Sequence, residues 1–131
     1  MRVALGIGCD RGTPADTIMR AVEAALKQAG ATASDVAAVA SIDLKADEPG
    51  MAEFAATHNW HIVFYPAAEL AQIAVPNPSE TVRKYTGTPS VSEAAALLAA
   101  KVDMRELLVE KFKLRGSDGR NATISIARIT S

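Results

Sequence analysis

The alternation of short apolar runs with longer helical patterns is the feature that most limits what this chain can fold into. Residues 2–7, 36–42 and 61–65 are apolar enough to be buried strands. Between them, apolar residues recur at helical spacing over 13–30 and 51–58. Strands that alternate with helices in this way pair in parallel through right-handed crossovers, so the pattern predicts an α/β fold.

The segment 13–30 carries signals for both ends of its helix. Thr13 has a side chain suited to the N-cap, and Pro14 suits the first helical position. Gly30 suits the left-handed position that ends a helix. We therefore expect this helix to start directly after the glycine-rich segment that precedes it.

The middle of the chain predicts two further helices separated by a loop. Residues 66–74 form a short helical pattern, and 75–90 is a loop-rich stretch in which Ser79 could cap a brief turn. The alanine-rich segment 90–101 is a strong helix candidate. Its residues Ser90 and Glu93 have the spacing of a capping box.

The C-terminal residues predict a hairpin. Residues 107–114 and 122–129 read as strands, and the Asp-Gly pair within 115–121 favours a tight turn between them. The complete pattern predicts a three-layer α/β sandwich: a mainly parallel sheet with helices on both faces and an antiparallel C-terminal hairpin at its edge. The length suits a single domain over 1–131.

Composition argues against several classes of protein. The net charge of −1 gives no reason to expect nucleic acid or a membrane surface as a partner. With Cys9 as the only cysteine, an internal disulfide and a Cys-rich zinc site are excluded, and we expect a cytoplasmic protein. No segment approaches the ~20 apolar residues of a membrane span, and the first residues have too short an apolar core for a signal peptide.

The charge is nevertheless uneven along the chain, because the final third is locally basic. The basic residues that outnumber the acids there are Arg105, Lys111, Lys113, Arg115, Arg120 and Arg128. Two interpretations remain open: a strand face covered by water, or a rim that faces an anion.

Polar residues follow each predicted strand, where a parallel sheet places its ligand-binding edge. They are Cys9, Asp10, Arg11 and Gly12 after the first strand, Asp43, Lys45, Asp47 and Glu48 after the second, and Tyr65 and Pro66 after the third. The loop that carries Asn77, Ser79, Glu80 and Ser90 could reach the same edge. This convergence of polar loops predicts a binding site at the carboxyl ends of the strands.

The first of these loops belongs to the stretch GIGCDRG, residues 6–12. Gly6 and Gly8 are expected to let the backbone turn sharply and to let another group approach closely. Gly12 leads into a helix start, where unpaired N–H groups and the helix dipole favour an anion. Arg11 adds a planar fork suited to a carboxylate or phosphate. The alternative is a tight turn with a surface arginine.

The glycine spacing G-x-G-x-x-x-G is similar to a dinucleotide fingerprint but out of register with it. The last glycine comes one position late, and Asp43 lies farther downstream than the usual ~20 residues. A small nucleotide-binding module is therefore one alternative to keep.

Individual residues also allow two interpretations each. Cys9 near a helix start could be a nucleophile with a lowered pKa, or a small residue that fills a crowded turn. Glu48 and Glu93 stand where helix caps stand, so capping is the alternative to a binding role for both. His58 and His61 belong to a predicted helix and strand, and we expect no metal and no cofactor.

Four ordered segments together resemble a known family. They are GIGCDRGTPADTI (6–18), ASIDLKADEPGMAEFA (40–55), PNPSETV (76–82) and GTPSVSEAAALLAA (87–100), and the closing ATISIARI also fits. The chain is similar, nearly from end to end, to the CobE family, equivalent to the C-terminal domain of CbiG in cobalamin (vitamin B12) biosynthesis.

The resemblance implies a role in building the corrin ring. Full-length CbiG proteins open the ring-A lactone of a cobalt-precorrin and release acetaldehyde, using additional domains before this one. This chain starts at the first strand, so it looks like the stand-alone CobE type of the oxygen-dependent pathway. The family's motif residues that fall on this sequence are Cys9, Arg11, Gly12, Lys45, Glu48, Ser79, Ser90 and Glu93.

The resulting first hypothesis is a protein that binds a precorrin-type tetrapyrrole as a carrier or accessory subunit, with other enzymes of the pathway as candidate partners. The second is a hydrolase of the ring-A lactone. In that case Glu48 or Asp43 would activate water, and Lys45 or Arg11 would stabilise the oxyanion. Under the first hypothesis, loss of Arg11 or Lys45 should weaken binding and change stability little.

Overall fold

The computed structural model describes residues 1–78 and 91–131. Its centre is a five-stranded sheet with the order β3-β2-β1-β5-β4. The strands are β1 (Val3–Cys9), β2 (Val36–Ile42), β3 (Ile62–Tyr65), β4 (Leu107–Arg115) and β5 (Asn121–Arg128). The first three strands pair in parallel, while β5 is antiparallel to both β1 and β4. The predicted parallel sheet with an antiparallel C-terminal hairpin at its edge is confirmed.

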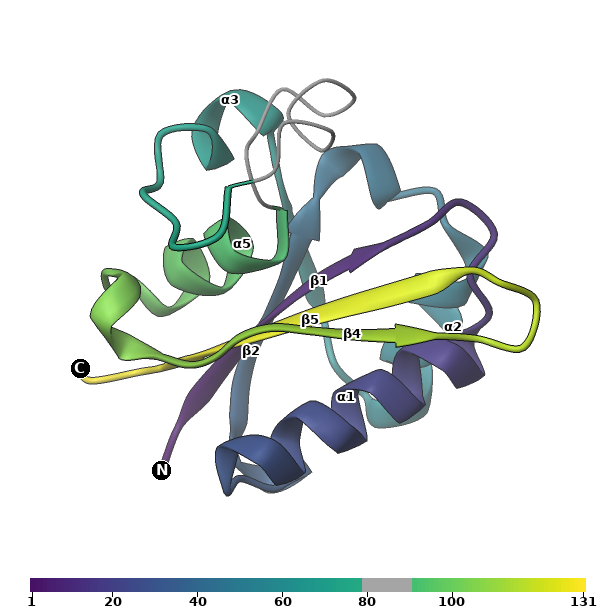
Figure 1. Cartoon of the computed structure of the whole chain (residues 1–131), viewed down its shortest axis with the longest axis horizontal. Helices are drawn as coiled ribbons and strands as arrows, with labels where there is room; N and C mark the ends of the chain where they lie inside the picture. The colour runs from purple at the N-terminus through teal and green to yellow at the C-terminus, as the bar shows by residue number, and fades with distance from the viewer. Residues whose placement is uncertain (79–90) are drawn as a thin grey trace.

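Helices cover both faces of this sheet, which confirms the three-layer arrangement (Figure 1). They are α1 (Ala15–Ala29) and α2 (Pro49–His58) on one face, and α3 (Ala67–Leu70) and α5 (Val91–Ala100) on the other. Short 3₁₀ turns occur at η1 (Ala33–Asp35), η2 (Asp43–Lys45) and η3 (Met104–Glu106). No helix within residues 1–78 and 91–131 is long and apolar enough to cross a membrane.

Strand β1 is buried on both faces from Val3 to Ile7. Val3, Leu5 and Ile7 point into the core on the α1 side, as their alternation predicts. Gly6 points the other way, under α5, where an added Cβ would overlap the backbone of Ser92. The sharp turn predicted at Gly6 and Gly8 is wrong, because both glycines lie inside the strand. The close approach of another group is confirmed at Gly6, which lets the helix approach the sheet closely.

The start of α1 differs from the predicted cap. The helix begins at Ala15, and Pro14 is the residue before it. The hydroxyl of Thr13 donates to the carbonyl of Asp10 at 2.7 Å, so it ties the preceding loop together and does not cap the helix. At the other end, Gly30 adopts the predicted left-handed conformation with a φ of 72°.

The segment 66–74 is helical only over Ala67–Leu70. The capping roles predicted for Ser79 and Ser90 lie outside the described residues.

Candidate functional site

The loops after β1 and β2 are joined at the carboxyl edge of the sheet by one arginine and two acids. Arg11 Nη1 donates to Asp47 Oδ1 at 2.8 Å and to Glu48 Oε2 at 2.7 Å. Its Nη2 donates to the carbonyl of Leu44 at 2.7 Å, and Gly12 N donates to Glu48 Oε1 at 2.9 Å. We call Arg11, Gly12, Asp47 and Glu48 the edge clasp. The prediction that the Arg11 and Lys45 loops share one edge is confirmed.

Glu48 is the buried centre of the edge clasp. Its side chain is 4% exposed, although it directly precedes α2. It forms no capping bond with that helix, so capping, the alternative considered for Glu48, is not its role. Gly50 explains how the two loops come so close, since a Cβ there would overlap the carbonyl oxygen of Thr13. Gly12 has a φ of +79°, which favours glycine over other residues.

The hairpin strand β5 holds the same loop from its other side. Asp10 Oδ2 accepts from the backbone N of Asn121 at 2.8 Å and from its Nδ2 at 3.1 Å. Arg120 Nε donates to the carbonyl of Arg11 at 2.9 Å. This role of Arg120 and Asn121 was not predicted from the sequence. Both residues belong to the predicted hairpin turn 115–121, and only the strand register brings them to the loop of Asp10 and Arg11.

The contacts of the edge clasp also shift the pKa values of Asp47 and Arg11. Hydrogen bonds from Arg11 hold the pKa of Asp47 below its ordinary value, and the same contacts raise the pKa of Arg11. The Arg11 side chain remains 59% exposed, and Nε has no acceptor within the described residues. Arg11 can therefore hold the clasp and still offer N–H groups to a ligand.

Cys9 and Lys45 lie next to the edge clasp. Burial is the main cause that raises the pKa of the Cys9 thiol to about 11, while the positive charge of Lys45 acts in the opposite direction. The thiol is therefore protonated at neutral pH, which disfavours a nucleophilic role. Lys45 is half-buried and forms no ion pair with a described residue, whereas Asp43 in the same turn is exposed.

Glu93 belongs to a separate polar cluster on the α5 side of the sheet. Its carboxylate is completely buried and accepts from Asn77 N at 3.3 Å and from Asn77 Nδ2 at 2.7 Å. The same Nδ2 donates to Glu110 Oε1 at 2.9 Å, and Lys111 Nζ donates to the Asn77 carbonyl at 3.0 Å. Glu93 thus anchors the loop that contains Asn77. It does not touch the edge clasp.

The predicted site residues fall into three groups. Cys9, Arg11, Gly12, Asp43, Lys45 and Glu48 gather at the carboxyl edge, and Glu93 lies in the Asn77 cluster. Ser79 and Ser90 lie outside the described residues.

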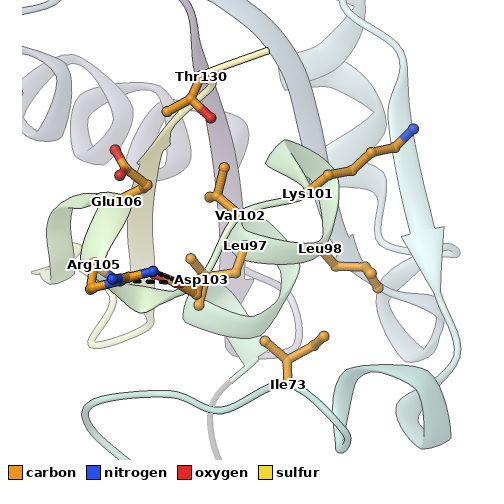
Figure 2. Close-up of a pocket in the computed structure, with 9 residues that line it drawn as sticks. All are labelled: Ile73, Leu97, Leu98, Lys101, Val102, Asp103, Arg105, Glu106 and Thr130. Carbon is orange, nitrogen blue, oxygen red and sulfur yellow. Dashed lines mark hydrogen bonds and ion pairs between the residues drawn. The ribbon is translucent and has the colours of Figure 1, made fainter.

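An open groove of about 560 Å³ lies at the opposite edge of the sheet, and sequence reasoning missed it (Figure 2). It is lined by Ile73, Leu97, Leu98, Lys101, Val102, Asp103, Arg105, Glu106 and Thr130. Its base is apolar, and its charged groups include an Asp103–Arg105 pair at 2.7 Å. No single motif contains this groove, because its residues come from separate segments that meet only in the fold.

Fold and site together define a three-layer α/β protein whose first two strand-to-helix loops form one polar edge. Comparison with known proteins makes this class specific. The chain belongs to the family described as Cobalamin synthesis G C-terminus, whose model matches residues 3–127. It is therefore a member of a cobalamin biosynthesis family.

Similar proteins bear this out. A cobalt-precorrin-5A hydrolase from Priestia megaterium is 40% identical over 127 residues, which cover 97% of this chain and 32% of that protein. Protein CobE from Sinorhizobium sp. is 42% identical over 100 residues, covering 75% of this chain and 65% of that protein. The chain thus spans less than two thirds of either relative.

Solved structures support the fold, and these matches cover nearly the full length of both chains. The crystal structure of CobE, a protein from the cobalamin biosynthetic pathway, has a TM-score of 0.84 and 33% identity. That match covers 99% of this chain and 95% of the other. The cobalamin biosynthesis protein chiG from Agrobacterium tumefaciens gives a TM-score of 0.67 at 33% identity, covering 98% and 99% of the two chains.

Proposed function

We propose that this chain, as a single domain over 1–131, binds a precorrin-type tetrapyrrole at the carboxyl edge and acts as a carrier or accessory subunit in oxygen-dependent cobalamin biosynthesis. The observation that carries the proposal is the edge clasp, which fixes two polar loops at the sheet edge where open α/β folds bind ligands. Membership of a cobalamin family supplies the class of ligand.

Each residue of the edge has a role in this proposal. Lys45 offers a half-buried ammonium group to a carboxylate of the ligand. Arg11 offers the N–H groups that form no hydrogen bond within the edge clasp. Glu48 and Gly12 keep the two loops in place. Cys9 provides a small, uncharged wall beside Lys45. Ser79, Ser90 and Glu93 enter the proposal through the family motif alone.

Hydrolysis of the ring-A lactone is the second candidate function, and similarity to a named cobalt-precorrin-5A hydrolase favours it. In this function a carboxylate must accept a proton from water. Both oxygens of Glu48 already accept hydrogen bonds within the protein, so Glu48 is poorly free to act as that base. Asp43 is exposed beside Lys45 and is the better candidate.

A nucleotide-binding function has less support. The first glycine of the apparent fingerprint is Gly6, and close packing against α5 accounts for it. Titration with NAD and ATP is expected to show no saturable binding.

Spectroscopic titration with a panel of precorrins and cobalt-precorrins tests the binding proposal. We expect saturable binding without product, and weaker binding by Lys45→Gln. Lys27→Gln is the matched control, because Lys27 is an exposed lysine in the last turn of α1. Chromatography of the same mixtures detects lactone opening. Product that disappears in Asp43→Asn would establish the hydrolase instead, and failure to bind any intermediate would contradict the proposal.

A further inference from the structure

A row of cations on β4 has no role in the edge site. Lys111, Lys113 and Arg115 alternate along the strand with Phe112 and Leu114. Phe112 and Leu114 pack against the core on the α1 side, so the three cations project from the opposite face of the sheet. All three are exposed. We call Lys111, Lys113 and Arg115 the basic row.

Among the described residues, the sheet beside the basic row is uncovered at Gly8. At Gly6 an added Cβ would overlap α5, but at Gly8 it would approach only Thr123 Cβ, at 3.9 Å, among the described residues. Thr123 pairs with Gly8 on one side and with Lys113 on the other. Gly8 and Thr123 therefore form a flat strip that leads across the sheet to the basic row. Figure 1 shows β4 and β5 running beyond α5 toward the hairpin turn.

The carboxylates nearest the basic row have other partners. Glu110 accepts from Asn77 Nδ2 at 2.9 Å, and Asp118 pairs with Arg120 at 3.1 Å. Within residues 1–78 and 91–131, no member of the basic row forms an ion pair. Lys111 Nζ donates one hydrogen bond to the Asn77 carbonyl. No carboxylate of the described residues neutralises the row, so its charge remains available to an anion.

The edge clasp alone provides no net positive charge, because its two carboxylates, Asp47 and Glu48, outnumber the one guanidinium of Arg11. A ligand with many carboxylates therefore needs further cations nearby. Alternate residues on a strand lie about 7 Å apart, and the basic row therefore spans about 13 Å. This span is comparable with the breadth of a tetrapyrrole macrocycle.

We infer that the strip of Gly8 and Thr123 is a platform for the tetrapyrrole macrocycle and that the basic row pairs with carboxylates on its periphery. The inference rests on the proposed function, since it takes the same ligand and extends its site from the loops onto the sheet. The competing explanation is that charges on β4 protect an edge strand from pairing with other chains.

The first experiment removes the row. Uroporphyrin, a polycarboxylate porphyrin, is titrated into the unmodified chain and into the Lys111→Gln, Lys113→Gln, Arg115→Gln variant, with porphyrin fluorescence as readout. The control variant is Lys27→Gln, Lys101→Gln, Arg128→Gln, which loses the same charge at exposed positions outside the basic row. We expect the Kd to rise about tenfold in the row variant and less than about twofold in the control. The salt dependence of binding should weaken only in the row variant.

The second experiment tests the platform formed by Gly8 and Thr123. Gly8→Val places a branched side chain on the strip and should weaken uroporphyrin binding several-fold. It should leave the binding of inositol hexakisphosphate, a polyanion without a macrocycle, unchanged. Equal uroporphyrin affinity in Gly8→Val and the unmodified chain would overturn the platform.

The two levels of the proposal fail differently. If the unmodified chain binds neither uroporphyrin nor a precorrin, the proposed function fails and the inference fails with it. If the unmodified chain binds uroporphyrin and the row variant binds it equally well, the inference alone is overturned. Self-association of the row variant on size exclusion, with its affinity unchanged, would show that the row protects the edge strand.

Discussion

The face of the sheet on the α5 side has two halves that differ in how their residues are partnered. On the covered half, Gly6 lies against the helix backbone, and the buried hydroxyls of Ser92 and Ser125 hydrogen-bond each other at 2.8 Å. On the open half, the only described atom within 4 Å of an added Cβ at Gly8 is Thr123 Cβ, and Lys113 forms no ion pair within the described residues. Groups partnered inside the protein maintain the fold, whereas groups without such partners are available to a ligand.

The same contrast holds at the loop edge. Arg11 is committed to the edge clasp, while Lys45 beside it is not. The structure therefore changes the expectation that losing either charge would affect stability little. Loss of Arg11 leaves Glu48 buried with fewer donors, so Arg11→Gln should lower stability, and Lys45→Gln should not.

The largest expected effect separates the two glycines of β1. Gly6→Ala forces α5 away from the sheet and should lower the free energy of unfolding by about 3 kcal/mol or more. Gly8→Ala meets only Thr123 Cβ, at 3.9 Å, among the described residues and should change the free energy of unfolding by less than about 0.5 kcal/mol. Urea denaturation of both variants measures the difference. Equal losses of unfolding free energy in the two variants would mean that the sheet is packed as closely at Gly8 as at Gly6, which would contradict the difference between the two halves.

A smaller effect is expected at the edge clasp. Glu48→Ala removes the acceptor of Gly12 N and one acceptor of Arg11, and should cost about 1–2 kcal/mol in the free energy of unfolding. Asp43→Ala is the matched control, since the Asp43 side chain is exposed and should contribute less than about 0.5 kcal/mol. If Asp43→Ala lowered stability as much as Glu48→Ala, the distinction between an acid bonded inside the protein and an exposed acid would be contradicted.

The reactivity of Cys9 sharpens the comparison further. Its pKa of about 11, against an ordinary 9.0, leaves less thiolate at pH 8 than an exposed cysteine has. Alkylation by iodoacetamide should therefore be about tenfold slower than that of a free cysteine peptide. Mass spectrometry follows the reaction cleanly, because Cys9 is the only cysteine. Lys45→Gln should slow it further, and a faster reaction would revive the nucleophile hypothesis.

The smallest effect concerns acid pH. Asp47 has a pKa below its ordinary 3.8 in the folded chain, because Arg11 donates hydrogen bonds to it. Its stabilising contribution is complete above the ordinary pKa and is lost as the pH falls through the lower folded value. Thermal melts should show the stability advantage of the unmodified chain over Asp47→Asn shrinking below about pH 4. An advantage that stays constant down to pH 2 would contradict the Arg11–Asp47 contact.

Local patterns were sufficient to predict most of the fold. The apolar run 36–42 coincides with β2, and Gly30 ends α1 as its type predicts. One exception is the turn predicted at Gly6, because a glycine required for helix packing looks the same in sequence as one required for a turn. The end of a helix depends on its neighbours in the chain, but the partner of Gly6 is Ser92, far along the sequence.

The location of the site at one edge of the sheet was predicted from the sequence, but the hydrogen-bond partners of its residues were not. Parallel strands place the Arg11 and Lys45 loops at one edge whatever their detailed contacts are. The pairing of Arg11 with Glu48 depends on the loops approaching closely at Gly50. An acid in a polar loop gives no local sign that it is buried. The open groove at Lys101 and Thr130 was missed for the same reason, since segments from different parts of the chain form it.

The position of β5 has a consequence for how the protein is made. β1 lies at the centre of the sheet, and one of its two edges pairs with β5, from Val3 with Arg128 to Cys9 with Ala122. During synthesis on the ribosome, that edge of the first strand stays unpaired until the last strand has left the exit tunnel. Native pairing of β1 is therefore completed only after β5 has been synthesised, and until then the nascent chain carries an unpaired strand edge that a chaperone can recognise.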